Sequence, residues 1–104
     1  MSNLSISEQY ARVAKDWVEL DSAASMLEET KSAVLSQMMG QHASLPVNRA
    51  EMLVKGSPEW SDFITKMVKA REAANLKKVH LEFLRMKFAE WNSSAADERL
   101  RAKL

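Results

Sequence analysis

The chain has 104 residues and a net charge of +1, with 15 lysine and arginine residues against 14 aspartate and glutamate residues. Cysteine is absent, which excludes a disulfide framework, a thiol nucleophile and a thiolate metal site. Only two glycines and two prolines interrupt a chain rich in helix-forming residues, so we expect a single all-α domain spanning residues 1–104.

A 4-3 repeat of apolar residues predicts a long helix over residues 6–39. Ser5, with Glu8 three residues later, fits the capping pattern of its start, and Gly40, directly after Met39, is a natural C′ residue at its end. The repeat averages 3.5 residues, so these side chains form one narrow seam that needs a partner helix. This first seam comprises Ile6, Tyr10, Val13, Trp17, Leu20, Ala24, Leu27, Lys31, Val34 and Met38.

The connection is expected to hold a short helix. Pro46 disfavours helical geometry in the residue before it, and Asn48 is suited to cap a helix over residues 49–55. Gly56 ends this helix. Ser57 and Pro58 then supply the cap and first-turn proline of the next one.

A second long helix is predicted over residues 58–92. It carries a matching second seam: Phe63, Met67, Ala70, Ala74, Lys77, Leu81, Leu84, Phe88, Trp91 and Ala95. The polar residues 92–94 either end this helix or are crossed by it, and residues 95–104 form a tail or a short helix.

Two seams of similar length predict a long antiparallel helical hairpin that resembles a coiled coil. The lysines within the seams, Lys31 and Lys77, should extend their charged ends to the edge of the contact or make a polar contact that fixes the register. A further apolar row lies about 140° around the second helix, too far for the same partner to cover. This row comprises Leu76, Val79, Phe83 and Met86. We expect a homo-oligomer, with a dimer that buries the row in a helical bundle favoured over a monomer whose connector and tail cover it.

Charge differs between the two halves. Residues 1–40 carry six acids and three bases, whereas residues 61–104 carry six acids and ten bases. A basic helix of this kind can contact DNA phosphates without reading bases, although lysine-rich solvated helices are common. The candidate nucleic-acid-binding residues are Lys66, Lys69, Arg71, Lys77, Lys78, Arg85 and Lys87.

No recognisable set of catalytic residues accompanies the helices, so we expect a protein that is not an enzyme and uses no cofactor. The two histidines, His42 and His80, lack the carboxylate spacing of a metal site in a helical bundle. Glu28 and Glu29 are adjacent acids that point about 100° apart and are expected to face solvent. The absence of cysteine, of a signal peptide and of an apolar run of about 20 residues favours a cytoplasmic protein without a membrane partner.

Several short segments resemble small helical proteins of tailed phages and prophages. These segments begin at Arg49, Ser57, Lys69, Phe88 and Ala95, and they read RAEM, SPEW, KAREAAN, FAEW and AADER. Such proteins are often encoded near genes for recombination and replication. The resemblance covers residues 48–104 and implies a phage protein in the host cytoplasm that assists these processes.

The leading expectation is therefore a non-enzymatic hairpin that binds as an accessory in DNA recombination or replication. The alternative is an inhibitor or adaptor that docks on a host protein, such as a nuclease or a defence complex. Binding to phosphates should weaken steeply with salt, whereas docking through an apolar row should not.

Overall fold

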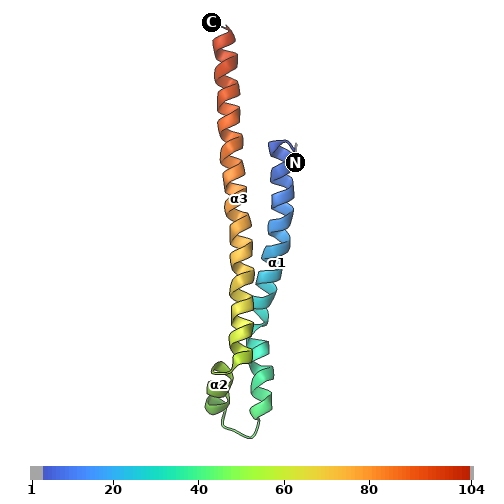
Figure 1. The fold of residues 1–104 in the computed structure, drawn as a ribbon, viewed down its shortest axis with the longest axis vertical. Coiled ribbons are helices and arrows are strands. Elements are labelled where there is room, and N and C mark those ends of the chain that lie inside the picture. Colours follow the sequence, from blue (N-terminus) through green and yellow to red (C-terminus); the bar gives the residue numbers. More distant parts are fainter. Residues whose placement is uncertain (1–3, 104) are drawn as a thin grey trace.

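The computed structural model describes residues 4–103 as an antiparallel helical hairpin (Figure 1). Its elements are α1 (Ile6–Met39), the 3₁₀ turn η1 (Gly40–His42), α2 (Val47–Lys55) and α3 (Pro58–Lys103). The two long helices lie side by side, and α2 packs where the chain reverses. The molecule is a rod of 83 × 26 × 17 Å. The predicted all-α hairpin is confirmed.

The first helix begins at its predicted cap. The Glu8 amide donates a hydrogen bond to Ser5 Oγ at 3.2 Å, and the Gln9 side chain donates to the Leu4 carbonyl at 2.9 Å. At the other end, Gly40 has right-handed helical geometry, with φ −58° and ψ −25°. Gly40 therefore does not stop the helix by a left-handed turn, and the chain continues into η1.

The short helix starts earlier than the sequence predicts. It begins at Val47, and Pro46 rather than Asn48 occupies the N-cap position. The Pro46 carbonyl accepts hydrogen bonds from the Arg49 and Ala50 amides, each at 3.0 Å. The fixed φ of Pro46, here −56°, already suits the entry to a helix, so a side-chain cap two residues later is not needed.

The second long helix starts as predicted but does not end at residue 92. Ser57 Oγ accepts a hydrogen bond from the Trp60 amide at 3.2 Å and donates one to the Val54 carbonyl at 2.6 Å. From Pro58 the helix runs without a break through residues 92–94 to Lys103, so residues 95–103 belong to α3 and form no separate helix. Asn and Ser lower helix propensity by only a few tenths of a kcal/mol each, and strong helix formers flank them.

The core is a thin layer between α1 and α3, extended by α2. Both seams contribute to it, because Val13, Ala24, Ala74 and Leu84 are buried. Ala24 and Ala74 have no exposed surface at all, which is what small residues permit when two helix backbones approach closely. The α2 helix adds Ala50 and Val54, and the start of α3 adds Trp60. Trp60 and Phe63 stack with ring centres 5.7 Å apart.

The two seam lysines differ in their surroundings. Lys31 is exposed, whereas Lys77 is half-buried, with its Nζ 3.5 Å from Asp16 Oδ2. Lys77 meets both expectations for a seam lysine: its charged end reaches the edge of the contact, and it makes a polar contact with Asp16 of the opposite helix.

Ala74→Leu tests the close approach of the helices. The larger side chain has no space at a fully buried position, so we expect a loss of about 1–3 kcal/mol in the free energy of unfolding. The same substitution at exposed Ala89 should change it by less than about 0.5 kcal/mol. Urea unfolding followed by circular dichroism measures both values. Equal effects would show that Ala74 is not tightly enclosed.

Candidate functional site

The seven candidate basic residues lie on α3, but they do not form one patch. Two of them are engaged by acidic residues of α1, namely Arg71 and Lys77. No ion pair joins the other five to any residue within the described range 4–103. These five are Lys66, Lys69, Lys78, Arg85 and Lys87.

Arg71 is the centre of the most extensive polar contact between the helices. Its guanidinium donates two hydrogen bonds to Glu28, from Nε to Oε2 at 3.0 Å and from Nη2 to Oε1 at 2.7 Å. It also donates to Asp21 Oδ1 at 2.6 Å and to Ser25 Oγ at 3.2 Å. Asp21, Ser25 and Glu28 are four and three residues apart, so they lie along one face of α1. A single arginine therefore spans two turns of the opposite helix.

This contact changes the titration of Glu28 and Arg71. The hydrogen bonds from Arg71 lower the pKa of Glu28 below its ordinary value, with the positive charge of Arg71 acting in the same direction. The hydrogen bonds to Glu28 and then Asp21 raise the pKa of Arg71. The guanidinium nitrogens of Arg71 all donate to residues of α1, so Arg71 has little remaining capacity for a phosphate.

The other five bases point in different directions. At 100° per residue, Lys78 and Arg85 lie on one side of α3, while Lys69 and Lys87 lie on nearly the opposite side. The Lys87 Nζ is 5.4 Å from the ring centre of Phe83, which places its charge over an aromatic face. Only two or three bases can therefore meet the same stretch of nucleic acid.

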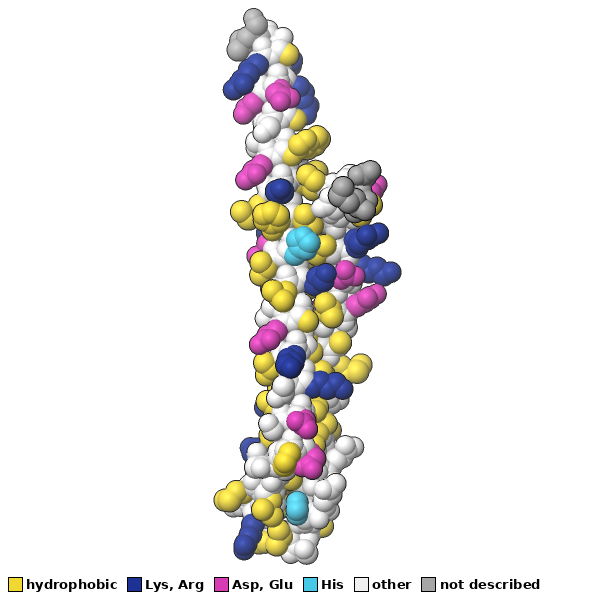
Figure 2. Space-filling model, in the orientation of Figure 1, with side chains coloured by type: hydrophobic (Ala, Val, Ile, Leu, Met, Phe, Trp, Pro, Cys, Tyr) yellow, Lys and Arg dark blue, Asp and Glu magenta, His cyan; other side chains and the backbone are white. Residues whose placement is uncertain are grey.

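The apolar row is open to solvent over its whole length. Leu76 is 72% exposed, Val79 62%, Phe83 51% and Met86 63%. Figure 2 shows hydrophobic side chains along the exposed surface of the molecule, with acidic and basic side chains between them. Neither α2 nor any other described segment covers the row. Scattered apolar side chains are common on surfaces, but these four lie together on one face of a helix, which makes the row a candidate docking surface.

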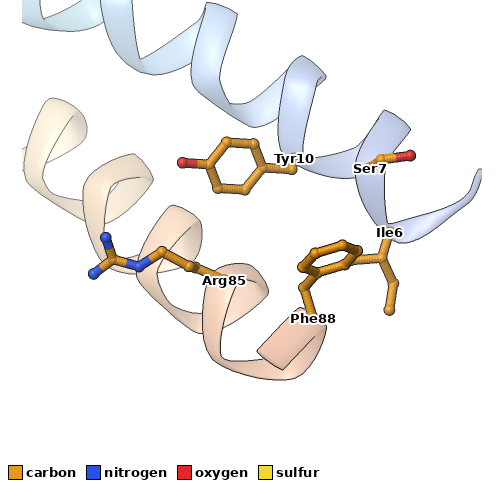
Figure 3. Close-up of a pocket in the computed structure, with 5 residues that line it drawn as sticks. All are labelled: Ile6, Ser7, Tyr10, Arg85 and Phe88. Carbon is orange, nitrogen blue, oxygen red and sulfur yellow. The ribbon is translucent and has the colours of Figure 1, made fainter. Parts of the chain in front are cut away.

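The open end of the hairpin contains a shallow hollow. It has a volume of about 250 Å³ and is lined by Ile6, Ser7, Tyr10, Arg85 and Phe88. Figure 3 shows the Phe88 ring beside Ile6, whereas the Ser7 hydroxyl points away from the other side chains. The walls are mainly apolar. The hollow lies at the end of the contact between α1 and α3.

The described residues contain no group of three or more His, Asp or Glu side chains placed to hold a metal ion. None of the helices within residues 4–103 combines the length and apolar character needed to cross a membrane. Comparison of the chain with protein-family models, with curated proteins and with solved structures finds no match.

The sequence prediction missed the contact around Arg71. It assigned Arg71 to a possible nucleic-acid surface and Glu28 to a solvent-facing position. Glu28 is exposed as expected, but it also binds Arg71. A signal was present, because aligning Ala24 with Ala74 in an antiparallel pair brings Arg71 level with residues 25–28. The spacing of Asp21, Ser25 and Glu28 then supplies acceptors on a single face.

Glu28→Gln tests this contact through the pH dependence of stability. Because the pKa of Glu28 is lowered in the folded chain, its contribution to stability is present above the ordinary carboxyl pKa of 4.5. That contribution is lost as the pH falls through the lowered pKa. We expect Glu28→Gln to lower the thermal midpoint at pH 7, and the difference from the unmodified chain to shrink toward pH 3.

Glu29→Gln provides the matched control, since Glu29 is exposed and makes no ion pair with a described residue. Its thermal midpoint should follow that of the unmodified chain at both pH values. A difference for Glu28→Gln that stays constant with pH would contradict the proposed role of the Glu28 charge.

Proposed function

We propose that the chain acts by binding rather than by catalysis, as a helical-hairpin adaptor that docks a partner protein on the apolar row. The observation that carries the proposal is the exposure of Leu76, Val79, Phe83 and Met86, all between 51% and 72%. Their 3-4-3 spacing is that of one side of a helix–helix contact, and the long hairpin holds them in a straight line. A helix of the partner is the matching surface.

The residues at the two ends of the row indicate the chemistry of this partner. Glu72 and Glu90 occupy the next positions of the same 4-3 repeat, and both are exposed. A second copy centred on the row would place Glu72 against Glu90 if antiparallel, or each glutamate against itself if parallel. Either arrangement brings like charges together. The row therefore favours a different protein, with apolar residues in the middle of a helix and Lys or Arg near both ends.

This proposal corresponds to an inhibitor or adaptor that docks on a host protein. A cytoplasmic location, expected from the absence of cysteine, is part of the same proposal. Self-association through the row is the less favoured outcome because of the two glutamates.

A designed helical peptide tests the docking surface. It carries leucines at the spacing of the row and a lysine at each end, and a second peptide has glutamates in place of the lysines. We expect the lysine peptide to bind the unmodified chain about tenfold more tightly, because it alone pairs with Glu72 and Glu90. Fluorescence anisotropy of labelled peptide measures both affinities. Absence of binding by the lysine peptide would contradict the proposal.

Phe83→Asp should weaken binding of the lysine peptide by about tenfold or more, since it removes an apolar contact worth about 1.5–3 kcal/mol on burial. Met26→Asp is the matched control, because Met26 is also exposed, at 68%, but lies on α1. It should leave the affinity unchanged. If both variants bind as well as the unmodified chain, the row is not the docking surface.

A second candidate function is an accessory in DNA recombination or replication, as the resemblance to phage proteins implies. It is supported by the five candidate bases of α3 that form no ion pair with the acids of α1. The engagement of Arg71 and Lys77 weakens this candidate relative to protein docking. The remaining bases, spread over two sides of the helix, suit contact with a few phosphates and no reading of bases.

DNA binding has a distinct salt dependence. A complex that neutralises about two phosphates of duplex DNA should weaken about tenfold between 50 and 200 mM salt. Lys78→Glu combined with Arg85→Glu should abolish such binding, whereas Glu82→Lys, on the same part of α3, should strengthen it. Anisotropy of labelled single- and double-stranded DNA measures these effects. Binding that ignores both salt and these charges would exclude a phosphate contact.

A further inference from the structure

One edge of the hairpin carries a basic side chain of α3 at every seventh residue. These residues are Arg71, Lys78 and Arg85, and their spacing keeps them within about 40° of one another around the helix. The acids of α1 engage only the first of them, since Arg71 binds Asp21 and Glu28. Lys78 and Arg85 are exposed and form no ion pair with a described residue. Positive charge on this edge is therefore balanced at Arg71 and unbalanced nearer the open end of the hairpin.

Beside these two basic side chains, α1 places aromatic rings instead of acids. Tyr10 and Trp17 are also seven residues apart, and at 100° per residue they lie on the same side of α1 as the acids that bind Arg71. The two rings line a hollow of about 270 Å³ together with Lys78 and Arg85. Tyr10 is 40% exposed and Trp17 is half-buried, so both rings are accessible from solvent.

The antiparallel arrangement of the helices repeats this pairing along the edge. Seven residues along α1 in one direction match seven along α3 in the other, so Tyr10 is level with Arg85 and Trp17 with Lys78. Each level holds one ring and one positive charge, and the two levels are about 10 Å apart. Figure 3 shows the Tyr10 ring and the Arg85 side chain reaching in the same direction from the two helices. We call this surface the edge groove.

We propose that the edge groove binds single-stranded nucleic acid, with nucleobases stacked on Tyr10 and Trp17 and phosphates held by Lys78 and Arg85. Every nucleotide supplies one flat ring and one negative charge, which is what each level of the groove can bind. In a duplex the nucleobases are stacked inside the helix, so only the phosphates reach such a groove. The inference rests on the second candidate function, contact with DNA phosphates, and adds the site and the class of nucleic acid.

Two other residues line the groove and set its properties. Leu81 lies between the two levels, and Glu82 places one negative charge among the positive ones. Two basic side chains against one acid give a weak site, so we expect a dissociation constant on the order of 10⁻⁴ M at 50 mM salt, the weak end of non-specific binding. No side chain in the groove is placed to distinguish one nucleobase from another, and stacking tolerates any sequence.

Fluorescence anisotropy on the whole chain tests the proposal with three labelled probes. The first is a strand of twelve thymidine nucleotides, the second an abasic strand with the same number of phosphates, and the third a duplex of the same length. We expect the thymidine strand to bind at least about fivefold more tightly than the abasic strand, because one stacked nucleobase contributes that much. It should also bind more tightly than the duplex. Equal affinity for the thymidine and abasic strands, or a preference for the duplex, would overturn the proposal.

Substitutions of the rings locate the stacking. Tyr10→Leu and Trp17→Leu should each weaken binding of the thymidine strand at least about fivefold and leave the abasic strand unaffected. Tyr10→Phe and Trp17→Phe keep a ring and should retain the affinity, which separates loss of stacking from loss of packing. Trp91→Leu removes an exposed ring outside the groove and should have no effect. An equal loss of affinity for both strands in the leucine variants would contradict stacking on these rings.

Lys78→Gln combined with Arg85→Gln should weaken binding of both strands, since both strands carry phosphates. Circular dichroism at the temperature of the binding measurement confirms that each variant keeps its helices. If the glutamine variant loses affinity but the leucine variants do not, the phosphates are contacted without stacking, and this inference fails while the second candidate function stands. If no strand binds at 1 mM, both fail.

A peptide of alternating glutamate and tyrosine provides the remaining comparison, because it also offers negative charges and rings. Tighter binding of this peptide than of the thymidine strand would identify the edge groove as a peptide site and overturn the proposal. The apolar row lies on a different side of α3 from Lys78 and Arg85, about 120° around the helix. Failure of peptide binding at the row would therefore leave these results unchanged.

Discussion

The contact between α1 and α3 is the interaction on which the rest of the structure depends. A single thin seam must hold two helices of 34 and 46 residues, since residues 4–103 contain no third long helix. Apolar packing gives this contact its affinity, and the complete burial of Ala24 and Ala74 sets the distance between the helices. Arg71 adds specificity, because its hydrogen bonds to Asp21, Ser25 and Glu28 favour one alignment of the two helices.

The thinness of this contact explains why so much apolar surface remains exposed. A helix in a two-helix hairpin can bury only one face, yet α3 carries apolar residues on two. The row at Leu76, Val79, Phe83 and Met86 is exposed because α1 covers only the other apolar face of α3. Phe88 and Trp91 are also exposed, because α3 is longer than α1. In the proposed docking function, the exposed Glu72 and Glu90 at the two ends of the row would pair with basic residues of a partner helix.

Some of the basic residues that the sequence suggests for nucleic-acid binding instead form ion pairs within the folded hairpin. The excess of acids in the first half and of bases in the second is used partly within the hairpin, where Arg71 and Lys77 pair with α1. This internal pairing supports the antiparallel arrangement and reduces the charge available to nucleic acid. For this reason, the proposed function is docking of a protein rather than binding of phosphates.

The sequence by itself determined the helices and their pairing, because a 4-3 apolar repeat and the caps at Ser5 and Ser57 are local signals. It also identified the apolar row, since periodicity shows that one helix carries two apolar faces. Only the tertiary structure decided which charged side chains form ion pairs. The register of α1 against α3 brings Arg71 to Glu28, which lies 43 residues away in the sequence. The continuous helix through residues 92–94 was likewise not determined by local preference, because Asn and Ser are compatible with both a helix end and a helix interior. The projecting end of α3 follows from that continuity and from the register together, which no local pattern contains.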